Sequence, residues 1–172
     1  MRRIAPGAAM VSAVLALAAC TPIPPPRQQA AVRPPPTIVP PPPAAPDWRD
    51  VPETPGGWSY AQNAAGSTAS FGQPGGAVEF AFSCDTARRT VTMSRPGTAA
   101  GSMTIRTSYS VQAWPATPQA DGRIAVTLAA ADPFLDRIAF SRGRFTVDDS
   151  GAATLVLPAW AEPARVIEDC RG

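Results

Sequence analysis

The side chains of this chain that could do chemistry gather between positions 132 and 144. Asp132 and Asp136 lie four positions apart, so on a helix their carboxylates would share one face. A pair of carboxylates can hydrolyse a glycosidic bond without histidine. However, Asp132 precedes Pro133 as a helix N-cap does, and arginines lie near Asp136. We therefore favour structural roles for both carboxylates over catalysis.

Three arginines of the same stretch could bind an anion. Arg137, Arg142 and Arg144 carry planar guanidinium groups, which bind phosphate and carboxylate through paired hydrogen bonds. Arg142 and Arg144 are two apart, so on a strand they would share one face, opposite Phe145. The alternative, which we favour, is a solvated strand face whose arginines pair with nearby carboxylates, because most exposed ion pairs contribute little.

Missing residue types exclude several kinds of site. The sequence contains no histidine, which removes serine–histidine and cysteine–histidine catalysis, histidine-containing zinc sites and the usual pH switch. The run Asp148-Asp149-Ser150-Gly151 lacks the ligands and spacing of a calcium-binding EF-hand loop and predicts a turn. No catalytic residue, metal ion or cofactor is predicted.

Tryptophans offer a further chemistry, stacking on sugar rings. The sequence has four, at Trp48, Trp58, Trp114 and Trp160. Trp58 is expected in the core, whereas Trp114 and Trp160 each neighbour a proline and are the better candidates for exposure. Convergence of these two on one pocket with Arg142 would favour a ligand site, and scatter would favour a scaffold.

The overall charge argues against nucleic-acid binding. The formal charge of +2 includes four arginines within the first 46 residues. The other eleven arginines and all thirteen acidic residues lie in residues 47–172, which leaves that segment at −2. A slightly acidic domain does not attract a polyphosphate backbone.

The N-terminus predicts export. Met1-Arg2-Arg3 is positively charged, and residues 8–18 form an apolar run broken only by Ser12. The run has the length of a signal-peptide core and is too short to span a bilayer as a helix. It ends in Leu17-Ala18-Ala19-Cys20, which matches the lipobox, so the segment resembles a bacterial lipoprotein signal. The alternative is an ordinary secretory signal with an incidental cysteine.

That resemblance implies a defined processing route. The Cys20 thiol would receive diacylglycerol, cleavage would remove residues 1–19, and the new amino group would be acylated. The acyl chains would anchor the protein stably in the bilayer, since each buried methylene contributes about 0.8 kcal/mol. Residue Thr21 is not aspartate, which in this family favours sorting to the outer membrane, facing the periplasm, over the inner membrane.

Residues 20–46 are expected to form a tether. Three runs of consecutive prolines fix φ and remove backbone donors, so neither helix nor sheet can form. Polyproline II is the default, and at about 3.1 Å per residue the segment would reach up to about 80 Å. A ligand for a proline-binding domain or for the cell wall is the alternative, but directly after a lipid anchor a spacer suffices.

Residues 47–172 predict a single, mainly β domain of ordinary size. Apolar and polar residues alternate in short segments separated by glycine and proline turns, which is typical of an antiparallel β-sandwich or barrel. The clearest strand is 78–84. A long strand is expected from Met103 to Val111 with Tyr109 facing inward, followed by a loop over 114–122. Shorter strands are expected around 58–60, 69–71, 91–93, 124–128, 145–147 and 155–157.

Two segments predict helices. Asp132 and Pro133 should begin a short helix over 132–140 that ends near Ser141. Near the C-terminus the apolar residues follow helical spacing, at Pro163, Val166, Ile167 and Cys170. A strand through the same segment is the alternative.

Two cysteines remain once Cys20 is assigned to lipid. Outside the cytoplasm a remaining pair predicts a disulfide, here Cys84–Cys170. Cys84 lies on the apolar face of the clearest strand and Cys170 on that of the last helix. A bridge would therefore fasten the end of the chain to the sheet. Two separate buried thiols are the alternative.

The segments 132–145 and 155–171 resemble parts of uncharacterised bacterial lipoproteins. In overall plan, a small β-rich envelope protein with one disulfide, the chain also resembles the invasion-associated locus B family. Neither resemblance implies an activity or a site residue. We expect a non-enzymatic binding or structural module of the cell envelope, with acylated Cys20 in the bilayer and an unidentified protein or envelope partner. The alternative is a small envelope enzyme or enzyme inhibitor with its site near Asp132 and Asp136 or near Arg142 and Arg144.

Overall fold

The computed structural model describes residues 47–172. The signal peptide expected at 1–19, the lipidated Cys20 and the proline-rich tether lie outside the described residues. Within residues 47–172, no helix is both long and apolar enough to cross a membrane.

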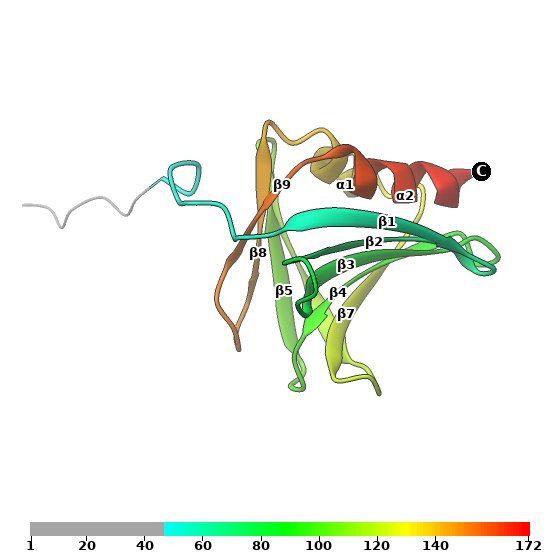
Figure 1. Cartoon of the computed structure of the whole chain (residues 1–172), viewed down its shortest axis with the longest axis horizontal. Coiled ribbons are helices and arrows are strands. Elements are labelled where there is room, and N and C mark those ends of the chain that lie inside the picture. The colour runs from blue at the N-terminus through cyan, green and yellow to red at the C-terminus, as the bar shows by residue number, and fades with distance from the viewer. Residues whose placement is uncertain (1–46) are drawn as a thin grey trace, which may run out of the picture. The chain divides into compact units, whose positions relative to one another are not determined.

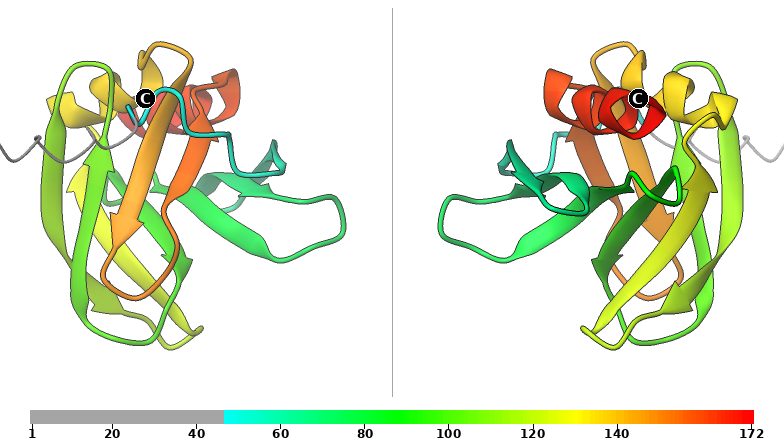
Figure 2. Two further views of the ribbon diagram at one scale, coloured as in Figure 1. Left: turned by 90° about the vertical axis from the view of Figure 1, so that its left-hand side faces the viewer. Right: turned by 90° about the vertical axis from the view of Figure 1, so that its right-hand side faces the viewer.

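Nine antiparallel strands form one strongly curled sheet, and two helices lie together over one of its openings (Figures 1 and 2). The expected mainly β, barrel-like domain is therefore confirmed. The order across the sheet is β1-β2-β3-β4-β7-β6-β5-β8-β9. The strands are β1 Gly57–Asn63, β2 Gly66–Gly72, β3 Val78–Asp85, β4 Thr90–Pro96, β5 Gly101–Arg106, β6 Val111–Pro118, β7 Arg123–Ala129, β8 Arg144–Asp149 and β9 Leu155–Pro158. The helices are α1 Pro133–Ala139 and α2 Ala161–Arg171.

The concave face of the sheet holds an aromatic core. The period-two pattern predicted for β3 turns Phe80, Phe82 and Cys84 inward, where the phenylalanines are fully buried. Trp58 lies in the middle of this core, with ring centroids 5.3 Å from Phe71 and 5.8 Å from Phe82. Edge-to-face pairs of this kind add to the burial of apolar area.

The two edge strands, β1 and β9, do not pair with each other, and the segment around Thr54 joins them instead. The Thr54 amide donates to the Val156 carbonyl at 2.9 Å, and the Val156 amide donates to the Thr54 hydroxyl at 2.9 Å. The indole Nε1 of Trp58 donates to the Pro158 carbonyl at 2.9 Å. These bonds satisfy part of the β9 edge and draw β1 towards it.

A buried ion pair lies at the opening of the sheet away from the helices. Arg95 at the end of β4 contacts Asp149 at the end of β8, with Nε and Oδ2 2.9 Å apart, and their side chains are 4% and 6% exposed. Arg95 also donates to the Ala153 carbonyl at 2.9 Å. Because β4 and β8 are not neighbours in the sheet, the pair ties one wall to the opposite one.

Helix α2 lies across β1 to β4 and is joined to β3 by the disulfide Cys84–Cys170, whose Cα atoms are 5.4 Å apart. The sequence prediction of this bridge agrees with the structure. The helical spacing also holds, since all four apolar residues of the pattern are buried. Helix α1 begins as expected, because the Asp132 carboxylate accepts from the Phe134 amide at 2.8 Å.

The strand expected from Met103 to Val111 is wrong. The chain turns back at residues 107–110, so β5 and β6 form a hairpin. Thr107 causes the turn: its hydroxyl accepts from the amides of Tyr109 and Ser110 at 3.2 and 3.1 Å. A threonine hydroxyl that bonds its own following backbone competes with strand pairing. Tyr109, expected inside, is consequently 54% exposed.

The loop expected over 114–122 is also wrong in its first half, which belongs to β6. The Thr107 amide donates to the Ser110 carbonyl, and hydrogen-bonded positions alternate along a strand from there. The backbone groups of the even-numbered residues of β6 therefore point to β5, and those of the odd-numbered residues point to β7. However, β6 pairs with β7 only at Thr117 and Pro118. The backbone nitrogen of Pro115 thus points to a side where no neighbouring strand needs an N–H donor. A strand tolerates proline at such a position.

Removing the disulfide should destabilise the domain. In the variant Cys84→Ala/Cys170→Ala the free energy of unfolding should fall by about 2 to 5 kcal/mol, because the bridge joins residues 86 apart in sequence. Urea denaturation followed by tryptophan fluorescence measures the loss. Cys20→Ala, which leaves the bridge intact, is the control and should keep the midpoint. An unchanged midpoint in the double variant would show that packing alone holds α2.

Breaking the buried ion pair on one side should cost more than removing it whole. Arg95→Met should destabilise by about 3 to 5 kcal/mol, because Asp149 is left buried without its cation. Adding Asp149→Leu should recover a large part of the loss, and a double-mutant cycle in urea measures the difference. Arg88→Gln, at an exposed ion pair, is the control and should leave the unfolding midpoint nearly unchanged. Equal losses in single and double variants would contradict this role.

Candidate functional site

The two carboxylates considered for catalysis have separate structural partners. Asp132 caps α1, whereas Asp136 forms an ion pair with Arg171 of α2, at 2.7 Å between Oδ1 and Nη1. The first contact fixes the start of a helix and the second joins α1 to α2. Asp136 also lines a shallow cleft with Tyr109, Arg137 and Phe140, and Asp132 is not among the lining residues.

The structure divides the three candidate arginines into two groups. Arg144 lies on β8 and turns to the start of the described chain, where it donates to the Val51 carbonyl at 2.7 Å and contacts Glu53 at 3.4 Å. Arg142 lies before β8 begins, not on the strand as expected. Arg137 and Arg142 both flank the β5–β6 turn, so two of the three arginines come together.

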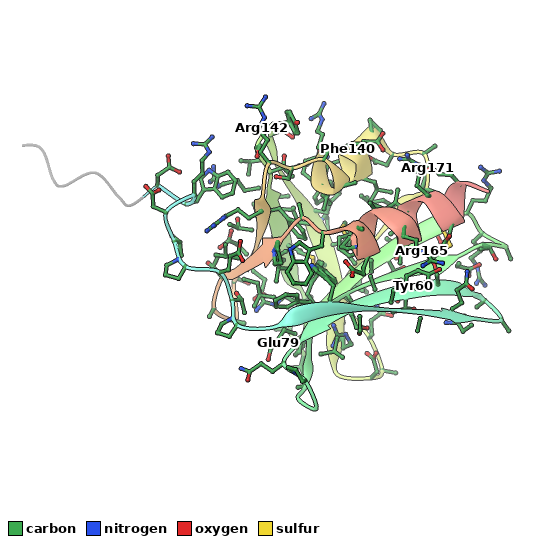
Figure 3. All side chains as sticks on the ribbon, turned by 45° about the horizontal axis from the view of Figure 1, so that its top comes forward. Tyr60, Glu79, Phe140, Arg142, Arg165 and Arg171 are labelled. Carbon is green, nitrogen blue, oxygen red and sulfur yellow. A yellow bond between two sulfur atoms is a disulfide. The ribbon has the colours of Figure 1, made fainter. Side chains whose placement is uncertain are left out.

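These two arginines and two exposed aromatic rings form what we call the aromatic–arginine tip, which consists of Tyr109, Arg137, Phe140 and Arg142. Figure 3 shows Phe140 and Arg142 at this end of the domain. Tyr109 is 54% exposed and Phe140 is 66% exposed. The two rings and Arg137 line a shallow cleft of about 330 Å³. The Arg142 guanidinium lies 5.9 Å from the centroid of the Tyr109 ring, within the range of a cation–π contact.

A set of serine hydroxyls holds the tip in place. The Ser108 amide donates to the Ser141 hydroxyl at 3.0 Å, and the Arg142 amide donates to the Ser108 hydroxyl at 2.8 Å. Arg137 donates to the Ser110 hydroxyl at 3.1 Å. These bonds fasten the β5–β6 turn to the segment between α1 and β8. Binding at the tip would therefore order little additional chain.

The tip carries positive charge that the described residues do not neutralise. Within residues 47–172, neither Arg137 nor Arg142 forms an ion pair. The nearest acid in the cleft, Asp136, is already paired with Arg171. An exposed apolar surface next to two free guanidinium groups has the composition of a binding surface.

The tryptophans do not converge on Arg142. Trp160 is 50% exposed and lies beside Gly57 at the start of β1. Trp114 is half-buried and packs edge-on against Phe134 of α1, with centroids 4.7 Å apart. The cleft that Trp114 lines includes neither Trp160 nor Arg142. Because the two tryptophans and Arg142 lie apart, their positions favour a scaffold over a sugar-binding pocket.

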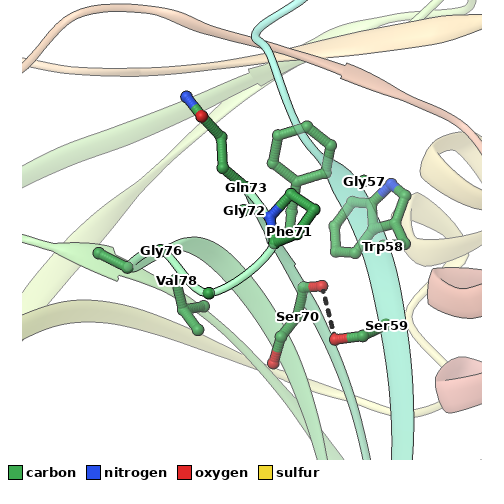
Figure 4. A pocket seen from close by; sticks show the side chains of 12 residues that line it. Gly57, Trp58, Ser59, Ser70, Phe71, Gly72, Gln73, Gly76 and Val78 are labelled. Carbon is green, nitrogen blue, oxygen red and sulfur yellow. Dashed lines mark hydrogen bonds between the residues drawn. The ribbon is translucent and has the colours of Figure 1, made fainter.

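A second depression, of about 430 Å³, lies beside the β2–β3 turn (Figure 4). Its lining runs from Ser70 to Val78 and includes Trp58 and Ser59 of β1. No ionisable side chain lines it. The Trp58 indole, its one large aromatic group with a donor, already bonds Pro158. The depression therefore offers few polar groups that could bind a ligand.

A polar cluster lies where β1 meets α2. The Tyr60 hydroxyl donates to Asp169 at 2.6 Å, and the Arg165 guanidinium stacks on the Tyr60 ring at 4.0 Å. The hydrogen bond from Tyr60 lowers the pKa of the Asp169 carboxyl below its usual value. The cluster joins edge strand β1 to α2 beside the disulfide. Its contacts therefore have a structural role.

The sequence identified the tip only in part. Arg137 and Arg142 were named as candidates, but Tyr109 was expected inside and Phe140 was not singled out. The available signal was Thr107-Ser108-Tyr109-Ser110, in which three hydroxyl residues that favour turns surround the tyrosine. Strict alternation through this stretch concealed the turn.

The Tyr60–Asp169 bond should make a pH-dependent contribution to stability. Tyr60→Phe should cost about 1 kcal/mol or less at pH 7, because it removes a donor to a partly exposed carboxylate. The pKa of Asp169 is lowered in the folded state, so the cost should be constant above pH 3.8 and vanish as pH falls through that lower pKa. Urea denaturation from pH 2 to pH 7 measures it. Tyr109→Phe is the control, and a cost that grows in acid would contradict the assignment.

Comparison of the chain with protein-family models found no match, and comparisons with curated proteins and with solved structures found no significant match either. The function must therefore be argued from this chain's own residues.

Proposed function

We propose that this chain is a lipid-anchored module of the cell envelope that binds a partner and does not catalyse a reaction. The observation that carries the proposal is the pairing of Cys84 with Cys170. It accounts for two of the three cysteines and leaves Cys20, the residue at the lipobox match, as the remaining thiol. A disulfide also fits an oxidising compartment outside the cytoplasm, which is where lipidation would place the domain.

The rest of the N-terminal sequence supports the same assignment. The proline-rich residues 20–46 would separate the domain from the bilayer by up to about 80 Å. With Thr21 after the cysteine, the outer membrane facing the periplasm is the preferred location. The protein would then be held at a surface while its β domain reaches other envelope components.

The binding surface in this proposal is the aromatic–arginine tip. Aromatic rings and arginines suit contact with a protein or with a membrane surface, and rigid anchors lose little entropy on binding. The enzyme alternative has less support, because Asp132 and Asp136 each have a structural partner that explains their position.

Removing the proposed acylation site should release the protein from membranes. Cys20→Ala should move the protein from the membrane fraction to the soluble periplasmic fraction, because no thiol remains to carry the lipid. Fractionation, together with intact mass of the wild-type protein, measures the effect and the acyl chains directly.

The matched control is Cys84→Ala/Cys170→Ala, which keeps Cys20 and should stay with the membrane. Unchanged fractionation and unchanged mass for Cys20→Ala would overturn the anchor.

A further inference from the structure

We infer that the aromatic–arginine tip docks on an anionic membrane surface, so that the domain lies against the bilayer that holds its tether. The inference rests on the proposed lipid anchor for its setting. Its evidence is separate, because it comes from the tip's side chains and from the position of the chain's described start.

The tip has the side chains that suit a membrane interface. Phe140 presents an apolar ring that is 66% exposed, and Tyr109 presents a ring with a polar hydroxyl. Tyrosine is favoured at the headgroup level, where one end of the ring is apolar and the other is wet. Both rings line one cleft, and Phe140 points outward from the domain (Figure 3). They could therefore enter the interface together.

The charges of the tip match an anionic headgroup layer. Arg137 and Arg142 flank the rings and have no ion-pair partner among residues 47–172. Each basic side chain near an anionic surface raises the bound fraction roughly fivefold, so the two together contribute about 25-fold. Long arginine side chains also reach headgroup phosphates while their stems lie along apolar surface.

The described chain starts at the same end of the domain. Arg144 holds Val51 and Glu53 against β8, next to the segment that carries Phe140 and Arg142. Strand β8 pairs with β5, whose last residue, Arg106, precedes the Tyr109 turn. A tether leaving from this end can bring the tip to the membrane without wrapping around the domain.

Tethering also sets how strong the contact must be. Attachment to the same bilayer makes the contact intramolecular, so a weak interaction is sufficient. The serine-held turn adds to this, because the tip needs no ordering before it docks. Two rings and two arginines are an adequate surface under these conditions.

A photo-crosslinking experiment identifies the occupant directly. The chain from Cys20 to Gly172, oxidised so that Cys20 is the remaining thiol, is coupled through Cys20 to a maleimide lipid in vesicles. The vesicles are phosphatidylcholine alone or phosphatidylcholine with about one third phosphatidylglycerol. Phe140→p-benzoylphenylalanine carries the crosslinker, and mass spectrometry reads the adduct. Chemical coupling makes the result independent of whether cells acylate Cys20.

The expected result is a lipid adduct at position 140 in the anionic vesicles that falls at least fivefold in neutral ones. Adding Arg137→Gln and Arg142→Gln should lower the adduct by a similar factor. The crosslinker at Val78, which is exposed beside Glu79 at the end of the domain away from the tip, should give little lipid adduct in either vesicle (Figure 3).

Equal yields in anionic and neutral vesicles, or equal yields at positions 140 and 78, would overturn the docking. The same crosslinker in cells provides the second arm. A protein adduct at position 140 in place of lipid would assign the tip to a protein partner and also overturn it. Neither result would affect the anchor, which fractionation of Cys20→Ala tests by itself.

Discussion

A curled sheet whose two edges do not pair must be closed by contacts other than strand hydrogen bonds, and this constraint organises the domain. The edges β1 and β9 are joined through the Thr54 segment and the Trp58 indole. Trp58 can reach Pro158 because its ring lies across the aromatic core, so filling the interior and joining the edges depend on one residue. The remaining openings need separate closures. Helix α2 with its disulfide covers one, and the Arg95–Asp149 pair lies at the other.

These closures hold together the two open ends of the curled sheet. Burying an ion pair is costly unless the geometry is good, and Arg95 offsets that cost by bonding backbone carbonyls on the facing wall. The disulfide constrains a long loop, which raises stability chiefly through the unfolded chain. The tip is the surface where exposed apolar area and unpaired charge coincide.

The parts of this fold that local periodicity controls were predictable from the sequence, and the parts that depend on distant neighbours were not. Alternation in β3 and the i, i+3, i+4, i+7 spacing in α2 specify buried faces, so both elements and the bridge between them were correct. Pro115 was read as a loop residue because a proline removes a donor. It lies in a strand because β6 separates from β7 there, which only the tertiary structure determines. The Arg95–Asp149 pair shows the same limit, since its two members lie 54 positions apart and no local pattern connects them.

The tip shows how the same limit applies to function. Its four side chains come from the β5–β6 turn, from α1 and from the segment after α1, and hydroxyl groups join these elements. No single stretch of sequence contains that surface. Its position beside the start of the described chain gives the proposed tether a mechanical consequence. A linker attached at the far end would have to pass along the whole domain before the tip could face the membrane. A linker attached at this end lets the tip face the membrane over a shorter length of chain. Under the proposed anchor, contact between the tip and the bilayer then costs little chain entropy. A surface of two rings and two arginines is then enough to keep the domain at the bilayer.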